Sequence, residues 1–240
     1  MNETKLTFQR YEKKYLLSAE QYASLWAELE PRLRPDEFYK STVCSLYYDT
    51  DDYRLIRSSI ERPVYKEKMR LRSYGVPDAD SPVFVELKKK FGGIVYKRRV
   101  RTSESQAMGW LDRELPAPED SQTCREIDWV LARYALSPKA YIACDRIAYV
   151  ARDDGELRMT FDSGIRWRDD RLLLSAGTAG EELLADGQVL MEIKMPGSAP
   201  LWLAHMLSQA RAFPTSFSKY GSCYKKDLLH KYFDGVMEIA

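Results

Sequence analysis

The stretch Lys66-Glu67-Lys68-Met69-Arg70-Leu71-Arg72 decides the fold that we expect for this chain. In a β-strand, successive side chains point to opposite faces, so its four cations share one face and its two apolar residues take the other. An antiparallel strand with one charged, solvated face is common when it occurs alone. Here the pattern is informative because it returns several times along the chain.

The same alternation recurs in residues 8–16, 83–88, 96–101, 158–162 and 191–195. In each segment, charged side chains share one face of the predicted strand and apolar side chains share the other. Many strands of this kind predict an α+β protein in which an antiparallel β-barrel has a charged lumen. We expect the rest of the chain to support that lumen.

Composition places the chain among single-domain globular proteins. It has 240 residues, of which 45% are hydrophobic and 30% charged, and we expect one domain over residues 1–240. The formal net charge of +1 predicts no nucleic-acid partner. The N-terminus lacks an apolar signal segment and no apolar run is long enough to span a bilayer, so we expect a cytoplasmic protein. Four cysteines without a CxxC pair predict reduced thiols, and only two histidines argue against zinc.

Helices and strands alternate irregularly. Ser18 and Gln21 form a capping-box signal for a helix that ends at Pro31. Further helices are predicted over 52–59, over 103–135 with a break at 116–118, after Ser198, and through Phe233. Strands are predicted over 4–17, 42–49, 64–74, 82–90, 94–102, 139–151, 156–162 and 188–195, with a short strand pair in 163–175 and an acidic loop over 177–187.

The predicted strand faces gather basic residues that suit a polyanion. Arginine grips phosphate oxygens through two parallel hydrogen bonds, and lysine acts as a point charge. The alternative is a solvated sheet face balanced by salt bridges, which the sequence leaves open. The set comprises Lys14, Arg70, Arg72, Lys88, Lys97, Arg146, Arg158, Lys194 and Lys219.

Carboxylates share these faces. Hard oxygen ligands among phosphate-binding cations suit Mg²⁺ or Mn²⁺, although the same carboxylates could simply pair with neighbouring cations. They are Glu12, Glu86, Asp162 and Glu192. The Ser/Lys-rich stretch 213–220 could offer backbone amides and an ammonium group to phosphate. A hydrolase finds little support: no GxSxG, GxGxxG or Walker A motif is present, and we expect His205 to be packed and His230 to be exposed.

Eight segments, in order, carry a family resemblance. They are Arg10-Tyr-Glu12-Lys-Lys14-Tyr, Leu46-Tyr-Tyr-Asp-Thr50, Lys68-Met-Arg70-Leu-Arg72, Glu86-Leu-Lys88, Tyr141-Ile-Ala-Cys-Asp-Arg146, Arg158-Met-Thr-Phe-Asp162, Glu192-Ile-Lys194 and Phe217-Ser-Lys219-Tyr220. The series resembles the polyphosphate-polymerase (vacuolar transporter chaperone, VTC) branch of the CYTH-like triphosphate tunnel metalloenzymes. Each motif alone is weak, whereas eight in order are fairly specific.

The resemblance implies an eight-stranded antiparallel tunnel flanked by helices, with ATP and polyphosphate as partners. It implies transfer of the ATP γ-phosphate to a growing polyphosphate chain, with Mn²⁺ or Mg²⁺ required. A membrane-protein partner stays open. By position, the implied catalytic residues are Arg70, Arg72, Lys88, Arg146, Arg158 and Lys219. Lys14, Lys97 and Arg10 would bind substrate, and Glu192 would hold the metal. Lys194 is also predicted to bind substrate, because it lies on a charged strand face rather than because of the resemblance.

One departure from the superfamily's sequence pattern bears on which reaction the protein catalyses. The superfamily's Glu-x-Glu-x-Lys signature reads Arg10-x-Glu12-x-Lys14 here, which counts against a simple triphosphatase and suits the polymerase branch. A triphosphatase with water as the acceptor, or a non-catalytic polyphosphate-binding module, remain the competing hypotheses.

Overall fold

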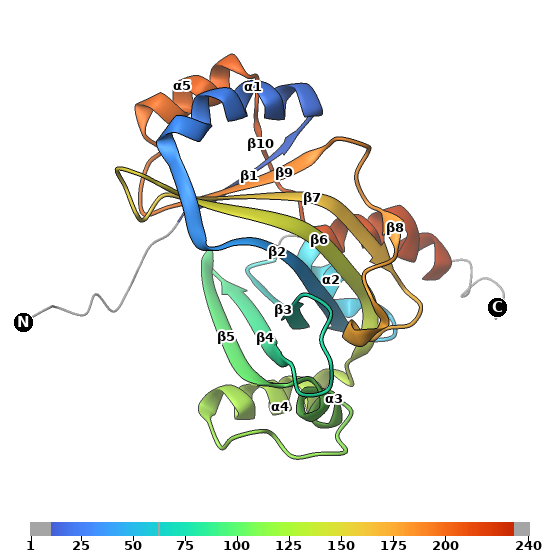
Figure 1. Ribbon diagram of the computed structural model, residues 1–240. Coiled ribbons are helices and arrows are strands. Elements are labelled where there is room, and N and C mark those ends of the chain that lie inside the picture. The colour runs from blue at the N-terminus through green and yellow to red at the C-terminus, as the bar shows by residue number, and fades with distance from the viewer. Residues whose placement is uncertain (1–10, 62, 233–240) are drawn as a thin grey trace, which may run out of the picture. The chain divides into compact units, whose positions relative to one another are not determined.

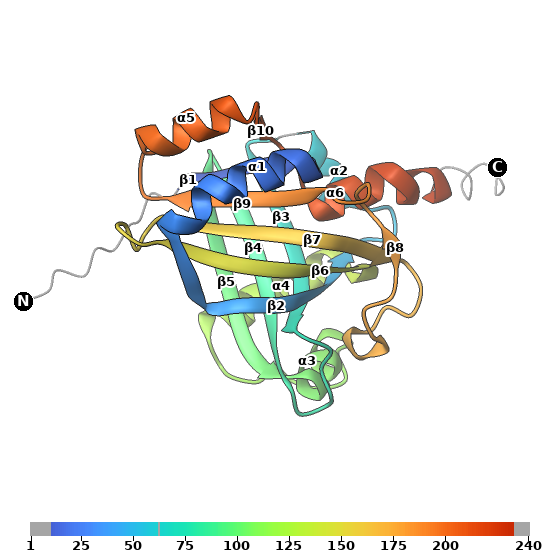
Figure 2. The same ribbon diagram turned by 45° about the horizontal axis from the view of Figure 1, so that its top comes forward.

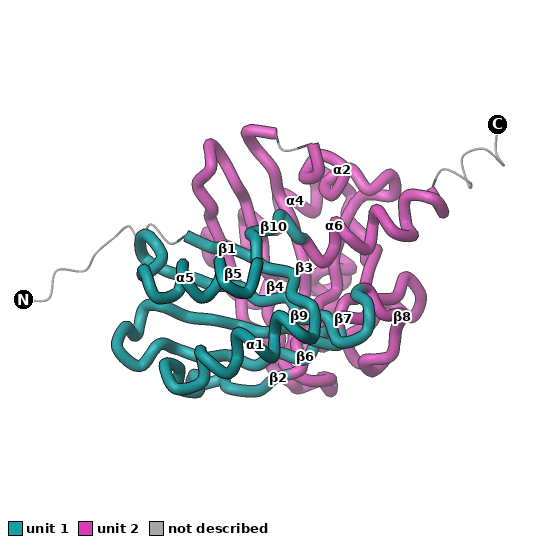
Figure 3. The backbone as a smooth tube through the Cα atoms, turned by 90° about the horizontal axis from the view of Figure 1, so that it is seen from above, with its two compact units in different colours: residues 1–41, 144–164, 184–217 teal, residues 42–143, 165–183, 218–240 magenta. Residues whose placement is uncertain are grey.

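The computed structural model of the protein describes residues 11–61 and 63–232. The chain forms two compact units, each made of three segments (Figure 3). Unit 1 comprises residues 1–41, 144–164 and 184–217, and unit 2 comprises residues 42–143, 165–183 and 218–240. Three strands, β2 (Leu33–Asp49), β6 (Ser137–Ala151) and β7 (Arg158–Arg168), begin in one unit and end in the other. The expectation of one domain stays a prediction.

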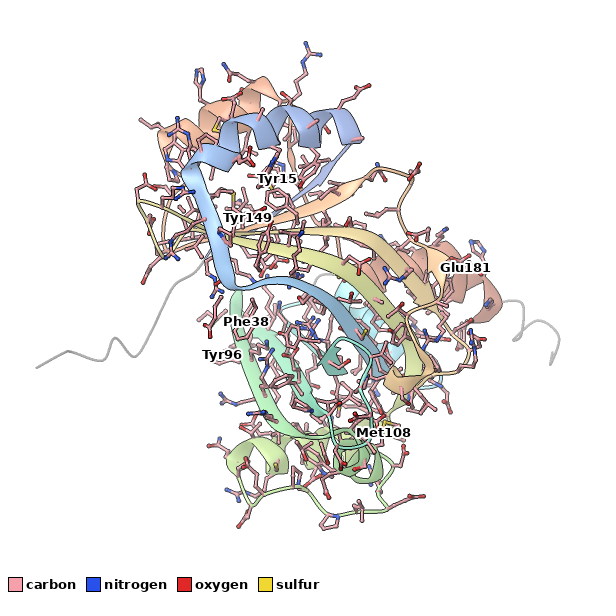
Figure 4. The ribbon with its side chains drawn as sticks, viewed as in Figure 1. Tyr15, Phe38, Tyr96, Met108, Tyr149 and Glu181 are labelled. Atoms are coloured by element: carbon pink, nitrogen blue, oxygen red, sulfur yellow. The ribbon has the colours of Figure 1, made fainter. Side chains whose placement is uncertain are left out.

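Unit 1 packs two helices on a set of strands. It contains β1 (Tyr11–Leu17), β9 (Val189–Met195), β10 (Pro214–Thr215), α1 (Ala19–Leu29), the short 3₁₀ turn η1 (Glu30–Arg32) and α5 (Leu201–Gln209). The capping box at Ser18 and Gln21 is confirmed and starts α1. Helices α1 and α5 lie side by side next to β1 and β9 (Figures 1 and 2). Tyr15 and Tyr149 belong to the buried cluster that the helices and strands of unit 1 share (Figure 4).

Unit 2 is built around a three-stranded meander. Its elements are α2 (Arg54–Ile60), β3 (Tyr65–Tyr74), β4 (Pro82–Phe91), β5 (Ile94–Ser103), α3 (Glu104–Leu111), α4 (Gln122–Tyr134), η2 (Leu174–Ala176), β8 (Glu181–Glu182), α6 (Lys219–Cys223) and the π-helical turn η3 (Tyr224–Leu228). Ser103 and Ser121 cap α3 and α4 through their side chains. In Figure 4, Met108 lies on α3, where its sulfur accepts a hydrogen bond from Tyr48.

The alternation in the opening stretch is confirmed as two faces of β3. Met69 and Leu71 are fully buried and pack with Val85 and Leu87 of β4 and with α3 and α4. Most charged side chains of the same strands, among them Lys68, Arg70 and Glu86, point the other way, whereas Glu67 and Lys89 lie on the Met69 face. Burial of the apolar face fixes the register, because a slip of one residue would turn most of the charges toward the core.

The strands pair in the order β10-β1-β9-β7-β6-β2-β3-β4-β5, and β8 adds to β7. The pairs β1–β9, β2–β3, β3–β4, β4–β5 and β7–β9 are antiparallel. An α+β protein with a large antiparallel sheet is therefore confirmed. In the described residues the path does not return to its first strand, so the prediction of a closed eight-stranded barrel is wrong, and the sheet has ten strands. Terminal strand β10 has two residues, one of them Pro214, and therefore offers few hydrogen bonds for closure.

Several local predictions change. Strand β2 begins at Leu33 rather than at residue 42, and β7 runs on to Arg168, where a separate strand pair was expected. The acidic loop contains β8, which pairs with β7. Cys44, Cys124, Cys144 and Cys223 are buried free thiols, as predicted. No helix in the described ranges is long and apolar enough to cross a membrane.

Candidate functional site

In unit 2, the charged face of β2 to β5 carries three rows of cross-strand neighbours. The central row is Tyr47, Arg70, Glu86 and Arg99. On one side lie Lys68, Lys88 and Lys97, and on the other Ser45, Arg72, Phe84 and Arg101. The rows form because residues two apart share a face and the antiparallel register aligns them.

Glu86 lies at the centre of this face. Arg70 reaches Oε2 of Glu86 from Nε at 2.7 Å and from Nη2 at 2.6 Å. On Oε1, Arg99 donates from Nε at 2.7 Å, and the Lys97 Nζ lies 2.8 Å away. We call Glu86 with Arg70, Arg99 and Lys97 the Glu86 cluster. One buried carboxylate therefore holds three cations, which leaves an excess of positive charge.

Burial and neighbouring charges shift the pKa values of groups in the Glu86 cluster. Burial acts to raise the pKa of the Glu86 carboxyl, but Arg70, Arg72 and Lys97 outweigh burial and hold it well below its usual range. Burial lowers the pKa of the Lys97 ammonium group in spite of Glu86. An anion that binds beside cations crowded in this way reduces the repulsion among them.

Tyr47 connects this cluster to the helices of unit 2. Its hydroxyl accepts a hydrogen bond from Arg70 Nη1 at 3.2 Å, and its ring stacks on Tyr220 with centroids 4.8 Å apart. Tyr220 donates to Asp49 at 3.0 Å, and Asp49 accepts two further bonds from backbone N–H groups at the start of α2. Burial acts to raise the pKa of Tyr47, yet Arg70 and Arg72 lower it to about 8. The Tyr47 hydroxyl is therefore a titratable group in hydrogen-bond contact with Arg70.

The Ser/Lys-rich stretch contributes Ser218 and Lys219 to unit 2. The Ser218 hydroxyl accepts hydrogen bonds from Lys68 Nζ at 3.0 Å and from Gly221 N at 3.3 Å. Lys219 is the first residue of α6. The capped turn thus places a hydroxyl beside the Lys68 row.

Unit 1 carries a second charged set on β1, β9 and β7. Cross-strand neighbours are Glu12, Lys194 and Arg158 in one row and Lys14, Glu192 and Thr160 in the next. Lys194 Nζ lies 2.8 Å from Glu192, and Lys14 Nζ lies 3.7 Å from Glu192 and 3.4 Å from Glu12. We call Glu12, Lys14, Glu192 and Lys194 the Glu192 cluster.

Carboxylates and cations are balanced in the Glu192 cluster, unlike in the Glu86 cluster. Burial acts to raise the pKa of Glu192, but Lys194 and Lys14 hold it well below its usual range. Beside the cluster, Arg146 donates to both oxygens of Asp162 at 2.6 and 2.7 Å, and Arg158 donates to Asp36. Asp162 is fully buried, so this bidentate pair fixes the Arg146 guanidinium.

Comparison with known proteins decides the family. The family model of the VTC domain matches residues 9–227. The chain belongs to the VTC domain family. Its fold is similar to the crystal structure of a proposed adenylate cyclase from Bacillus halodurans, with a TM-score of 0.53, 15% identity, and 86% of this chain and 92% of that chain covered. It is also similar to the PH1819 protein from Pyrococcus horikoshii, with a TM-score of 0.45, 12% identity, and coverage of 92% and 99%. No curated protein matches the chain.

Membership of the VTC domain family confirms the resemblance seen in the eight motifs. It supports a polyphosphate-related or triphosphate-tunnel function and an activity of the phosphoryl-transfer kind. The fold also implies dependence on a divalent metal ion. At 15% identity, the likeness to the Bacillus halodurans structure concerns the fold alone.

The residues of this VTC domain fit such a metal ion. In the described ranges no group of three or more His, Cys, Asp and Glu side chains could hold a metal by itself. Mg²⁺ and Mn²⁺ are, however, commonly held by one or two carboxylates together with substrate phosphates. Glu192 and Glu12 both contact Lys14, which brings two carboxylates to one place. The buried Thr160 hydroxyl, the cross-strand neighbour of Glu192, has no hydrogen-bond partner. This donor set suits a metal that shares its ligands with a phosphate.

The predicted site residues fall into the two units. Unit 2 brings together Arg70, Arg72, Lys88 and Lys97 on one sheet face and places Lys219 at the start of α6. Unit 1 brings together Lys14, Lys194 and Glu192. Arg146 and Arg158 form ion pairs beside them. Arg10 lies outside the described residues. Sequence reasoning missed Tyr47, Asp49 and Lys68 as site residues, although the alternation placed Lys68 on the correct face. His205 of α5 is exposed rather than packed, and His230 is exposed as predicted.

Proposed function

We propose that this VTC domain is an ATP-dependent polyphosphate polymerase, which transfers the γ-phosphate of ATP to a growing polyphosphate chain. The observation that carries the proposal is the Glu86 cluster, in which three cations share one buried carboxylate. A sheet face with this excess of positive charge suits a substrate with many negative charges. A single carboxylate ligand would leave most of that charge uncompensated.

In this proposal, the chain's own residues bind and align phosphates. Arg70, Arg72, Lys88, Lys97 and Lys219 bind phosphate oxygens in unit 2, and Lys14, Lys194, Arg146 and Arg158 do so in unit 1, with Arg10 added from the family motif. Arginines supply paired donors and lysines supply point charges. Phosphoryl transfer passes through a loose transition state, so alignment and neutralisation of charge account for most of the rate increase. The terminal oxygen of polyphosphate is already anionic and needs no general base.

The proposed metal ligands are Glu192, with Glu12 beside it. Mn²⁺ or Mg²⁺ bound there would neutralise charge on the phosphates that it shares. Held well below its usual pKa range, Glu192 is ionised and ready to bind a cation at neutral pH. The cytoplasmic location stays a prediction.

The test is an incubation of the purified protein with ATP and Mn²⁺. Products are resolved on a polyphosphate-stained gel while ADP and free phosphate are assayed. Long chains with one ADP per phosphate transferred would establish the polymerase. ADP with free phosphate and no chains would show a triphosphatase, and saturable polyphosphate binding without turnover would show a binding module.

Variants connect this activity to the site. Arg70→Ala should lower chain synthesis by about 100-fold or more, because it removes the central cation of the proposed phosphate-binding face. The matched control is Arg125→Ala, which removes an exposed arginine from an exposed ion pair of the same unit. Arg70→Ala with the turnover of the unmodified protein would contradict the site assignment.

A further inference from the structure

The turn between β4 and β5 carries an exposed apolar tip. Gly92 and Gly93 form the turn with positive φ angles, a conformation that glycine adopts easily. Around it, Phe91 is 57% exposed and Ile94 59%. The other exposed apolar side chains here are Val95 and Tyr96 of β5 and Val64 and Tyr65 at the start of β3. We call these six side chains the hairpin tip; Tyr96 is labelled in Figure 4.

Three members of the hairpin tip are cross-strand neighbours in unit 2. Phe91 pairs across strands with Ile94 on one side and with Tyr65 on the other, so the three side chains share a face. The rings of Tyr65 and Phe91 are 6.5 Å apart, and Gly92 N donates to the carbonyl of Val64. Contiguous exposed apolar surface of this kind marks an interaction site more often than scattered side chains do.

Cations lie on the same two strands as this apolar surface, most of them on the face opposite to Phe91 and Ile94. Residues 87–103 contain seven Lys and Arg residues and no Asp or Glu. The nearby carboxylates are already occupied: Glu126 holds Lys89 and Arg98, and Glu86 holds its own cluster. Glu67 is buried and accepts a hydrogen bond from Tyr65. The hairpin therefore presents positive charge together with apolar side chains.

We propose that the hairpin tip docks on an anionic lipid bilayer. Aromatic and aliphatic side chains enter the boundary between headgroups and acyl chains, and cations of the same strands attract anionic headgroups. A soluble polyanion would use the cations and leave the apolar side chains in water. A second copy of the same hairpin would cover the apolar side chains and bring like charges together. An anionic bilayer matches both properties, and this inference does not depend on the proposed polymerase activity.

Sedimentation with vesicles tests the proposal on the full chain. Vesicles of phosphatidylcholine with phosphatidylserine should bind the protein, and vesicles of phosphatidylcholine alone should not. The double variant Phe91→Ser/Ile94→Ser should bind the anionic vesicles at least about tenfold more weakly, because it removes the two side chains that would enter the bilayer. The control Phe38→Ser/Leu201→Ser removes two other exposed apolar side chains, both in unit 1, and should bind like the unmodified protein.

Two results would overturn the proposal. One is equal binding by the hairpin variant and the control, even if polyphosphate competes for the vesicles, because the basic face alone would then explain the attraction. The other is no vesicle binding together with a dimer that the hairpin variant abolishes, since the tip would then be a protein interface. Thermal unfolding and polyphosphate binding should be unchanged in the hairpin variant, which separates this test from a failure of the proposed activity.

Discussion

The two charged clusters of this protein differ in how they balance their charges. In the Glu86 cluster, Arg70, Arg99 and Lys97 converge on one buried carboxylate. In the Glu192 cluster, two carboxylates face two lysines, and the neighbouring Arg146 and Arg158 each have an aspartate of their own. The Glu86 cluster thus carries an excess of cations, whereas the Glu192 cluster is balanced.

Because of this difference, we expect the two charged faces to bind different ligands, although they look alike in the sequence. A face with unbalanced cations gains most from an added anion, because the anion relieves repulsion among the cations. A balanced face gains less from an added anion, but its carboxylates can accept a metal ion that arrives with phosphates. We therefore expect variants in unit 2 to change phosphate affinity and variants in unit 1 to change metal dependence.

The largest effect is expected for Glu192→Gln. The amide keeps the size of the side chain but removes the charge that would hold Mn²⁺ or Mg²⁺. We expect turnover to fall at least about 1000-fold, which corresponds to about 4 kcal/mol, with little change in polyphosphate affinity. Metal titrations of chain synthesis, with polyphosphate binding measured in parallel, check this.

The matched control is Glu156→Gln, which neutralises an exposed glutamate of unit 1. It should leave turnover unchanged. If Glu192→Gln lowered polyphosphate affinity as strongly as turnover, the division of roles between the two units would be wrong.

The second-largest effect is expected for Glu86→Gln, in the free energy of unfolding. Glu86→Gln leaves three cations around a neutral amide, and removing one partner from a buried ionic cluster costs about 3–5 kcal/mol of unfolding free energy. Tripolyphosphate should restore more of this stability than it adds to the unmodified protein, because the anion replaces the lost charge. Urea unfolding with and without tripolyphosphate measures both quantities.

Asp162→Asn gives the comparison from unit 1. It breaks the buried pair with Arg146 and should lower the unfolding free energy by a similar amount. Tripolyphosphate should not rescue it beyond its effect on the unmodified protein, because the Glu192 carboxylate still acts on Arg146 and the neighbouring lysines keep their carboxylate partners. Equal rescue of the two variants would contradict the contrast between the clusters.

The sequence predicted the faces of the strands better than their partners. Alternation with a period of two is a local property, so it identified which side of β3 and β4 carries charge. Pairing is long-range: nothing near Arg158 in the sequence indicates Asp36, which lies in the first part of β2, where no strand was predicted. Tyr47 and Tyr48 are adjacent and chemically alike, and only the register shows that Tyr47 shares the row of Arg70.

Closure of the sheet was beyond the sequence for a similar reason. Each strand can be recognised from its own residues, whereas closure requires hydrogen bonds between the first and last strands of the sheet. Those strands are β10 and β5, and β10 is too short to be recognised as a strand. The family resemblance therefore correctly predicted the motifs and incorrectly predicted a closed barrel.

A smaller effect is expected for Arg70→Lys. Lysine keeps the positive charge but cannot contact Glu86 and Tyr47 with a planar fork. We expect the KM for ATP to rise about tenfold, with a smaller change in kcat, because charge is retained and geometry is lost. Steady-state kinetics check this, with Arg125→Lys as the surface control.

The smallest effect, and the most specific for the Glu86 cluster, is a pH dependence carried by Tyr47. Its pKa of about 8 lies below that of an ordinary tyrosine, because Arg70 and Arg72 outweigh the effect of burial. Above pH 8 the phenolate adds a negative charge among the cations, so polyphosphate affinity should fall a fewfold between about pH 7 and pH 9. Tyr47→Phe should remove this dependence while binding polyphosphate normally at pH 7.

The same ionisation acts on stability with the opposite sign. The folded state releases the Tyr47 proton near pH 8, whereas the unfolded chain retains it until about pH 10, so the unfolded state binds more protons in between. Stability from the phenolate is therefore fully present above pH 10 and is lost as the pH falls through about 8. Urea unfolding of the unmodified protein should show this rise, and Tyr47→Phe should not. A protein that became more stable and bound polyphosphate more tightly over this range would show that Tyr47 does not titrate against the phosphate-binding cations.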